Sequence, residues 1–229
     1  MKRFFLIFLI NFVFISIQAQ KKNCYCKYYN VSEETLEDKI TCITLPNENI
    51  KLPKGEIYNQ LSSGDIILNN GEKITDRAIR YDGVLDQLIL PSADDRVKIA
   101  VEKSTLKGFD IRMFNSNKIL HYIKLNIKDI FSNNYEEHYV QLLVSGKTSL
   151  YASRGLQHAV AANELRIYYS YILVKEDGTM FHFLTYSRRY ITNLFPEKKN
   201  IFKQQLRKQR NRIRNEEQLI LAIELYNLL

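Results

Sequence analysis

Short apolar or alternating segments recur along the middle of the chain from residue 64 onward, with turn residues between them. Asp65–Leu68 and Lys73–Thr75 form the clearest pair, because the Asn70-Gly71 dipeptide between them favours the positive φ angles of a tight primed turn. Asp82-Gly83 and Asp177-Gly178 separate two further pairs of apolar segments. This pattern predicts a series of β-hairpins.

Other segments have the alternation or the short apolar run of a strand, namely Val97–Val101, Phe109–Phe114 and Tyr139–Val144. Strands and helices do not alternate along the chain, so a parallel nucleotide-binding sheet is not expected. We predict an antiparallel meander that forms an open curved sheet or a barrel-like one.

The C-terminal segment has the periodicity of helices. Residues 197–209 carry Ile201, Phe202 and Leu206 at helical spacing, and Asn215 followed by Gln218 resembles a capping box. The helix that follows would present one apolar face, made of Leu219, Ile220, Ile223, Tyr226 and Leu228. We therefore predict two helices within about residues 197–228. They would close against the sheet in an α+β fold that is predominantly antiparallel β.

The first 19 residues have the three parts of a secretory signal peptide. Lys2 and Arg3 give a positive start, Phe4–Ile17 is almost entirely apolar, and Ala19 supplies a small residue at the cleavage point. The apolar run ends at Lys21, short of the roughly 20 residues that span a bilayer. We expect residues 20–229 to form one exported domain, located in the periplasm, at the outer membrane or outside the cell.

Export changes the charge balance. The chain has 33 Lys and Arg against 25 Asp and Glu, a formal charge of +8, which falls to +6 when Lys2 and Arg3 leave. The chain contains 15 Tyr and no Trp. Tyr suits half-buried sheet faces, where the ring packs and the hydroxyl reaches water. A chain of this size buries a core without needing disulfides or metals to hold it.

Three cysteines remain after export. Cys24 and Cys26 are too close in sequence to pair with each other without strain, so either could bridge to Cys42. Such a bridge would contribute about 3 kcal/mol through the loop it closes. Free thiols are the alternative. A structural zinc site is not expected, because it usually needs C-x2-C pairs and four ligands.

No catalytic motif is complete in this sequence. Ser145–Thr148 resembles the end of a P-loop, but the motif needs a glycine where the chain has Gln141, so a hairpin turn is expected. None of the four histidines (His121, His138, His158 and His182) lies in a metalloprotease pattern, and His182 is expected to be a hydrogen-bonded, half-buried strand residue. We expect no enzyme activity, no metal and no cofactor.

A basic segment is the feature that stands out. Residues 187–214 contain ten Lys and Arg and one acid, Glu197, a net charge of +9, which leaves the rest of the mature chain at −3. One interpretation of this segment is a solvated helix face. The other is an anion-binding surface, because clustered cations raise the local anion concentration. The candidate residues for anion binding are Lys198, Lys199, Lys203, Arg207, Lys208, Arg210, Arg212 and Arg214.

Two parts of the sequence are similar to small secreted β-rich proteins of Bacteroidota, an uncharacterised family. One is Gly64–Thr75, which continues to Ile79–Asp82, and the other is the ending Asn215–Asn227. The Ala19-Gln20 junction also resembles exported proteins of that group. The resemblance implies export and a β-rich fold, and it implies no activity and no site residue.

Two functions from different classes are consistent with the sequence. The first is a non-enzymatic binding or interaction module whose basic C-terminal surface contacts an anionic membrane surface, a polysaccharide or an acidic protein. Nucleic acid is not an expected partner of an exported protein. The second is a periplasmic carrier that holds a lipid or another apolar ligand in the curved sheet, an expectation based on fold analogy.

Overall fold

The computed structural model describes residue 40 and residues 42–46, 61–83, 85–91, 97–113, 116–128, 135–154, 156–159, 164–167 and 169–229. The predicted signal peptide and Cys24 and Cys26 lie outside the described residues, so the cleavage and the disulfide stay predictions. Cys42, the third cysteine, is a buried residue of strand β1. No helix among the described residues is both long and apolar enough to cross a membrane.

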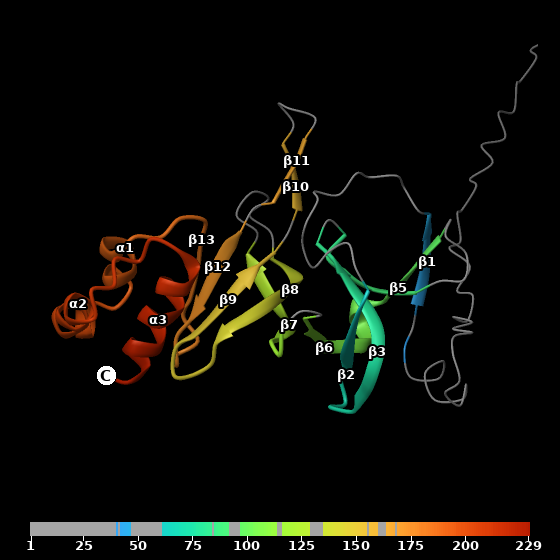
Figure 1. The fold of residues 1–229 in the computed structure, drawn as a ribbon, viewed down its shortest axis with the longest axis horizontal. Coiled ribbons are helices and arrows are strands. Elements are labelled where there is room, and N and C mark those ends of the chain that lie inside the picture. Colours follow the sequence, from blue (N-terminus) through green and yellow to red (C-terminus); the bar gives the residue numbers. More distant parts are fainter. Residues whose placement is uncertain are drawn as a thin grey trace, which may run out of the picture.

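The described chain forms one eleven-stranded sheet in the order β1-β5-β4-β3-β2-β6-β7-β8-β9-β12-β13 (Figure 1). Its strands are β1 (Cys42–Pro46), β2 (Ser62–Leu68), β3 (Lys73–Asp82), β4 (Gln87–Leu90), β5 (Val97–Val101), β6 (Leu106–Arg112), β7 (Ile119–Lys128), β8 (Tyr135–Val144), β9 (Ser149–Ser153), β12 (Ser170–Val174) and β13 (Met180–Phe183). Strands β10 (Leu156–Ala159) and β11 (Glu164–Ile167) form a separate hairpin. A short 3-10 helix, Lys103–Thr105, precedes β6.

Neighbouring strands are antiparallel throughout, as predicted. The sheet is a meander except at three places. Strand β6 pairs with β2, β1 pairs with β5 at one edge, and β12 pairs with β9 because the separate β10–β11 hairpin lies between them in the sequence. The predicted strands 97–101 and 139–144 belong to β5 and β8, and β6 covers the predicted strand as far as Arg112. The Asp82-Gly83 hairpin is the β3–β4 pair.

The turn at Asn70-Gly71 differs from the expected form, and the turn at Asp177-Gly178 has the same geometry. Gly71 and Gly178 have φ angles of 87° and 81°, but Asn70 and Asp177 lie outside the positive-φ region. The amide of Gly71 donates to the carbonyl of Leu68 (2.9 Å), as in a type I turn followed by a left-handed glycine. The hairpins are confirmed, but the primed turn was wrong, because a single left-handed residue closes these three-residue loops.

One face of the sheet carries both of the large hydrophobic cores. Residues that face each other in adjacent strands share a side of the sheet, and Tyr122, Gln141, Ala152, Tyr171 and Phe183 form such a row from β7 to β13. Tyr122 belongs to the first core, whereas Ala152, Tyr171 and Phe183 belong to the second. Among the described residues, the opposite face carries a smaller apolar cluster centred on three buried side chains, Ile127, Val140 and Ile172.

The first core lies against β1–β8 and is rich in aromatic rings. Phe109 and Tyr122 stack with ring centroids 4.8 Å apart, and Tyr81 and Tyr139 pack around them. All four side chains are at most 1% exposed. These three tyrosines are therefore more deeply buried than the half-buried positions that composition suggested.

The second core joins the sheet to the helical end of the chain. It contains residues of β8, β9, β12 and β13 together with Phe195, Phe202, Leu206, Leu219 and Ile223, the last five all fully buried. Figure 1 shows the helices gathered at the β13 end of the sheet. The α+β fold class and the packing of helices on the sheet are confirmed.

Three helices are present where two were predicted. They are α1 (Arg188–Asn193), α2 (Lys199–Lys208) and α3 (Glu216–Asn227), with a 3-10 turn, Pro196–Lys198, before α2. The side chain of Asn215 accepts a hydrogen bond from the amide of Gln218 (2.9 Å), which confirms the predicted cap. The predicted apolar face was wrong at its end, since Leu228 is 84% exposed and Ala222 is buried instead.

Candidate anion-binding site

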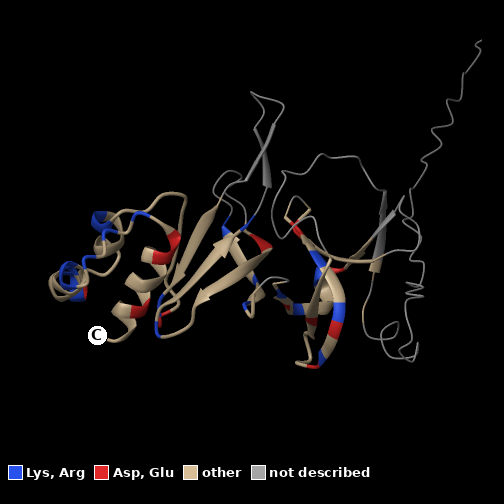
Figure 2. Ribbon diagram, viewed as in Figure 1, with Lys and Arg blue, Asp and Glu red and all other residues tan. Residues whose placement is uncertain are grey.

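Three segments of the helical end surround one pocket of about 400 Å³. Helix α1 supplies Arg188, Arg189 and Thr192, helix α2 supplies Lys203 and Arg207, and the connection between α2 and α3 supplies Arg212 and Arg214. We call these seven residues the arginine pocket. Figure 2 shows Lys and Arg gathering on α1, on α2 and on the segment before α3.

A buried asparagine in the connection fixes this arrangement. Asn211 is 8% exposed, and its carbonyl oxygen accepts hydrogen bonds from Nε (3.2 Å) and Nη2 (2.8 Å) of Arg188. Its side chain donates to the carbonyl of Gln218 (2.8 Å) and accepts from the amide of Ile213 (2.9 Å). Asn211 therefore ties α1, the connection and α3 together and orients the Arg188 guanidinium.

The backbone of the connection is strained at two non-glycine residues. Arg210 and Ile213 have φ angles of 52° and 51°, in the left-handed region that β-branched residues in particular avoid. Ile213 is nevertheless 1% exposed, since its side chain packs into the second core. Its exposed neighbours Arg212 and Arg214 consequently lie on the solvent side of the connection, where they line the pocket.

The pocket is strongly positive. Six of its seven residues are cationic, and among the described residues none of the six forms an ion pair with a carboxylate. Glu197, the single acid of the basic segment, accepts from the Tyr226 hydroxyl (2.7 Å) and lies 3.8 Å from Lys175 instead. Arg188 and Arg189 also occupy the first turn of α1, where the helix dipole disfavours cations. The hydrogen bonds of Arg188 to the Asn211 carbonyl connect α1 to the connection, whereas no ion pair within the described residues offsets the charge of Arg189.

The structure divides the predicted anion-binding residues into two groups. Lys203, Arg207, Arg212 and Arg214 line the pocket. The other four candidates, Lys198, Lys199, Lys208 and Arg210, are not part of the pocket lining. Lys198 lies over the Tyr226 ring (5.8 Å), and Arg210 lines a separate groove beside α3. Arg188, Arg189 and Thr192 are pocket residues that were not among the candidates, although both arginines belong to the basic segment.

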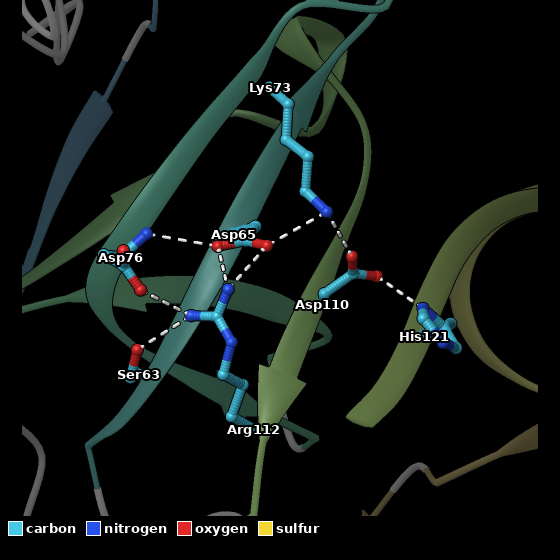
Figure 3. Close-up of polar contacts among 7 residues, drawn as sticks. All are labelled: Ser63, Asp65, Lys73, Asp76, Asp110, Arg112 and His121. Carbon is cyan, nitrogen blue, oxygen red and sulfur yellow. Dashed lines mark hydrogen bonds and ion pairs between the residues drawn. The ribbon is translucent and has the colours of Figure 1, made fainter. Parts of the chain in front are cut away.

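Figure 3 shows a second polar cluster, whose residues alternate along their strands with those of the first core and so lie on the opposite face of the sheet. Asp65 of β2, Asp110 of β6 and His121 of β7 are partners in the strand register and so form a row across the sheet. Nζ of Lys73 lies 2.9 Å from a carboxylate oxygen of each aspartate, and Arg112 makes two hydrogen bonds to Asp65 (2.8 and 2.9 Å). Each buried carboxylate thus has a cationic partner.

Each carboxylate of this second cluster is paired with a cation. Burial alone would raise the pKa of Asp65, but hydrogen bonds from Lys73, the Asp76 amide and Arg112 outweigh burial and leave the pKa below its ordinary value. Hydrogen bonds to Asp110 and Asp65 raise the pKa of Lys73. Because its ions already neutralise one another, this cluster holds the strands together and offers little charge to a ligand.

Two smaller predictions concern single motifs. Residues 145–148 form the turn between β8 and β9, as predicted, and no helix follows them. His182 is half-buried, with Nε2 2.9 Å from the Ser170 hydroxyl and Nδ1 3.1 Å from the Lys128 carbonyl, so the prediction of a hydrogen-bonded strand residue is confirmed. Over the described ranges, no group of His, Cys, Asp or Glu side chains is placed to hold a metal ion.

Comparison with known proteins adds no relative to this picture. No family model matches the chain, and no curated protein and no solved structure shows significant similarity to it. The resemblance to secreted Bacteroidota proteins stays a prediction, and function is inferred from the residues of this chain.

Proposed function

We propose that this protein is an exported, non-enzymatic binding module that holds an anionic ligand in the arginine pocket. The observation that carries the proposal is the convergence of six cationic side chains from α1, α2 and the connection around one pocket with no carboxylate in its lining. Anionic membrane surfaces, polysaccharides and acidic proteins all present the complementary charge.

The chemistry of the pocket lining supports binding over catalysis. The guanidinium and ammonium groups of the lining donate hydrogen bonds, and the lining has no carboxylate or imidazole to act as a general base. The one hydroxyl of the lining belongs to Thr192, which is fully buried and lies 3.2 Å from the Arg189 carbonyl, to which it donates. A nucleophile activated by a neighbouring base has no counterpart in this set of residues.

The alternative, a carrier of an apolar ligand in the curved sheet, receives less support. The site that such a ligand would need is occupied in the described structure by the rings of Tyr81, Phe109, Tyr122 and Tyr139. Their close packing resembles an ordinary protein interior. We therefore place the ligand at the helical end and not inside the sheet.

Affinity chromatography on a sulfated polysaccharide, together with co-sedimentation with phosphatidylglycerol vesicles across a salt series, tests the proposal. The pocket variant carries Lys203→Gln, Arg207→Gln and Arg212→Gln. The matched control carries Lys199→Gln, Lys208→Gln and Arg210→Gln, which removes the same charge from the same segment outside the pocket. We expect the pocket variant to bind about tenfold more weakly than the control, and binding of both to weaken with salt.

Equal loss in the two variants would show that net charge, and not the pocket, binds polyanions. Absent or salt-insensitive binding of the unaltered protein to both materials would contradict the proposal altogether. Circular dichroism of both variants tests whether they keep the fold of the unaltered protein.

A further inference from the structure

We infer that the arginine pocket takes a phosphate ester, meaning an organic group that carries a terminal phosphate. This inference rests on the anion-binding function proposed above and narrows it to one ligand chemistry. The evidence is the type of cation in the pocket, its amount of charge, its size and the way its side chains are held.

The pocket is lined mainly by arginine and contains a single lysine. Five of its six cations are arginines and one, Lys203, is a lysine, whereas the four cations of the basic segment outside the pocket are three lysines and one arginine, Arg210. A guanidinium presents its donors in a planar fork that matches two oxygens of a phosphate at once, whereas an ammonium acts as a point charge. The segregation of arginine into the pocket therefore favours an oxyanion that is bound by paired hydrogen bonds.

The amount of charge favours phosphate over a single carboxylate. A phosphate monoester carries about −1.5 to −2 at neutral pH and offers three strong acceptor oxygens, whereas a carboxylate carries one charge on two oxygens. Six cations that surround one pocket repel one another when no anion is bound. A dianion relieves more of this repulsion and accepts hydrogen bonds from more of the arginines.

The size of the pocket indicates that the phosphate is attached to something larger. Its volume of about 400 Å³ exceeds that of a phosphate group, and because the pocket is open to solvent, an attached group can extend out of it. A sugar, a glycerol or a lipid headgroup would fill the space beside the phosphate. The hydroxyl-rich members of this class suit a lining in which every side chain except Thr192 is charged.

Part of the pocket is organised before any ligand arrives. Arg188 is held by its two hydrogen bonds to the Asn211 carbonyl, and these use only Nε and Nη2, so Nη1 stays available for a ligand. The left-handed backbone at Ile213 fixes the positions of Arg212 and Arg214 on either side of it. Residues held in strained backbone conformations often mark functional sites, where the surrounding structure maintains them.

Isothermal titration with glucose 6-phosphate, citrate and glucose at constant ionic strength tests the inference. We expect saturable binding of glucose 6-phosphate, binding of citrate about tenfold weaker despite its greater charge, and no binding of glucose. Citrate that binds as tightly as glucose 6-phosphate would overturn the phosphate assignment but leave an anion-binding pocket in place.

Substitution of arginine by lysine separates geometry from charge. A protein with Arg207→Lys and Arg212→Lys keeps every charge of the pocket but loses two planar forks. We expect its affinity for glucose 6-phosphate to fall about tenfold, while retention on the sulfated polysaccharide stays nearly unchanged. An unchanged affinity for glucose 6-phosphate would refute the role of the guanidinium groups.

Vesicles distinguish the two sources of a phosphate ester. Phosphatidic acid presents a phosphomonoester at a membrane surface, whereas phosphatidylglycerol presents a diester of lower charge. Stronger binding to phosphatidic acid vesicles than to free glucose 6-phosphate would identify a lipid headgroup, and the reverse order would identify a soluble phosphate ester. Failure of both probes in a protein that still binds the sulfated polysaccharide would overturn this inference alone.

Discussion

Arg154, which follows strand β9, makes a bidentate ion pair with Glu216, the first residue of helix α3, with N–O distances of 2.7 and 2.8 Å. Nε of Arg154 also donates to the side chain of Gln141 (2.9 Å), and the Tyr171 hydroxyl donates to Glu216 (3.0 Å). The hydrogen bonds among these four side chains hold the start of α3 against the sheet. Because the connection that carries Arg212 and Arg214 leads directly into α3, the same group positions one wall of the arginine pocket.

We expect Glu216→Gln to lower the free energy of unfolding by about 2 kcal/mol, because the largely buried Arg154 would lose its bidentate contact to a carboxylate. Urea unfolding followed by circular dichroism measures the change. The matched control is Glu217→Gln, which alters the next, exposed residue of the same turn and should cost no more than about 0.5 kcal/mol. Equal effects of the two substitutions would argue against the ion pair as the fastening element.

Two tyrosine-to-phenylalanine substitutions should have opposite effects. The hydroxyl of Tyr122 is buried in the first core and, among the described residues, has no hydrogen-bond partner. We expect Tyr122→Phe to stabilise the protein by about 1 kcal/mol, since an unsatisfied buried hydroxyl is costly. Tyr171→Phe should destabilise it by about 1 to 2 kcal/mol, because its hydroxyl donates to Glu216. Thermal unfolding of both variants checks the signs, and destabilisation by both would show that the Tyr122 hydroxyl is satisfied.

Arg210 occupies the position after α2 that usually holds glycine. Its amide donates to the Arg207 carbonyl and the Asn211 amide donates to the Leu206 carbonyl, the two bonds of a Schellman motif with a left-handed residue. We expect Arg210→Gly to raise the free energy of unfolding by about 0.5 to 1 kcal/mol, because glycine removes strain that exceeds its entropy cost. Since Arg210 lies outside the arginine pocket, glucose 6-phosphate binding should not change. A fall in stability would mean that the Arg210 side chain contributes contacts that outweigh the strain.

Acid should weaken the protein partly through Asp65. Its pKa is depressed in the folded state, so the unfolded chain takes up its proton at higher pH than the folded one. The stability that Asp65 contributes is therefore complete above the unfolded pKa, near 3.9, and is lost as the pH falls through the folded pKa. We expect Asp65→Asn to lower stability at neutral pH and to flatten its decline below about pH 4. Urea unfolding from pH 2 to 6 tests this, and parallel pH profiles for both proteins would contradict it.

The hairpins were predictable because their signals are local. Gly71 and Gly178 close the β2–β3 and β12–β13 loops. Each follows an Asn or Asp and lies between two apolar segments, a pattern that predicts a left-handed glycine in a tight turn. Helix α1 gave no such signal, because six residues that begin with two arginines have no apolar periodicity. Leu228 was misplaced because the helix ends just before it, so helical spacing no longer determines which way its side chain points.

The sites depended on contacts between distant parts of the chain. The basic segment predicts an anion-binding surface, but it does not predict which cations line the pocket. That depends on the left-handed residues Arg210 and Ile213 and on the hydrogen bond from Arg188 to the Asn211 carbonyl. None of these has a local sequence pattern. The row formed by Asp65 and Asp110 likewise follows from the register of β2 and β6, which shifts between Ile67 and Leu68.

Strand β8 contributes Tyr139 to the first core and Val144 to the second. Both cores therefore share one continuous strand, and loss of its pairing with β7 or β9 would expose apolar groups of each. We expect the aromatic half and the helical half to melt in one cooperative transition, not as independent units. Because the chain has no tryptophan, tyrosine absorbance follows this transition, and a ligand that binds the helical end would raise the unfolding temperature of the tyrosine cluster as well.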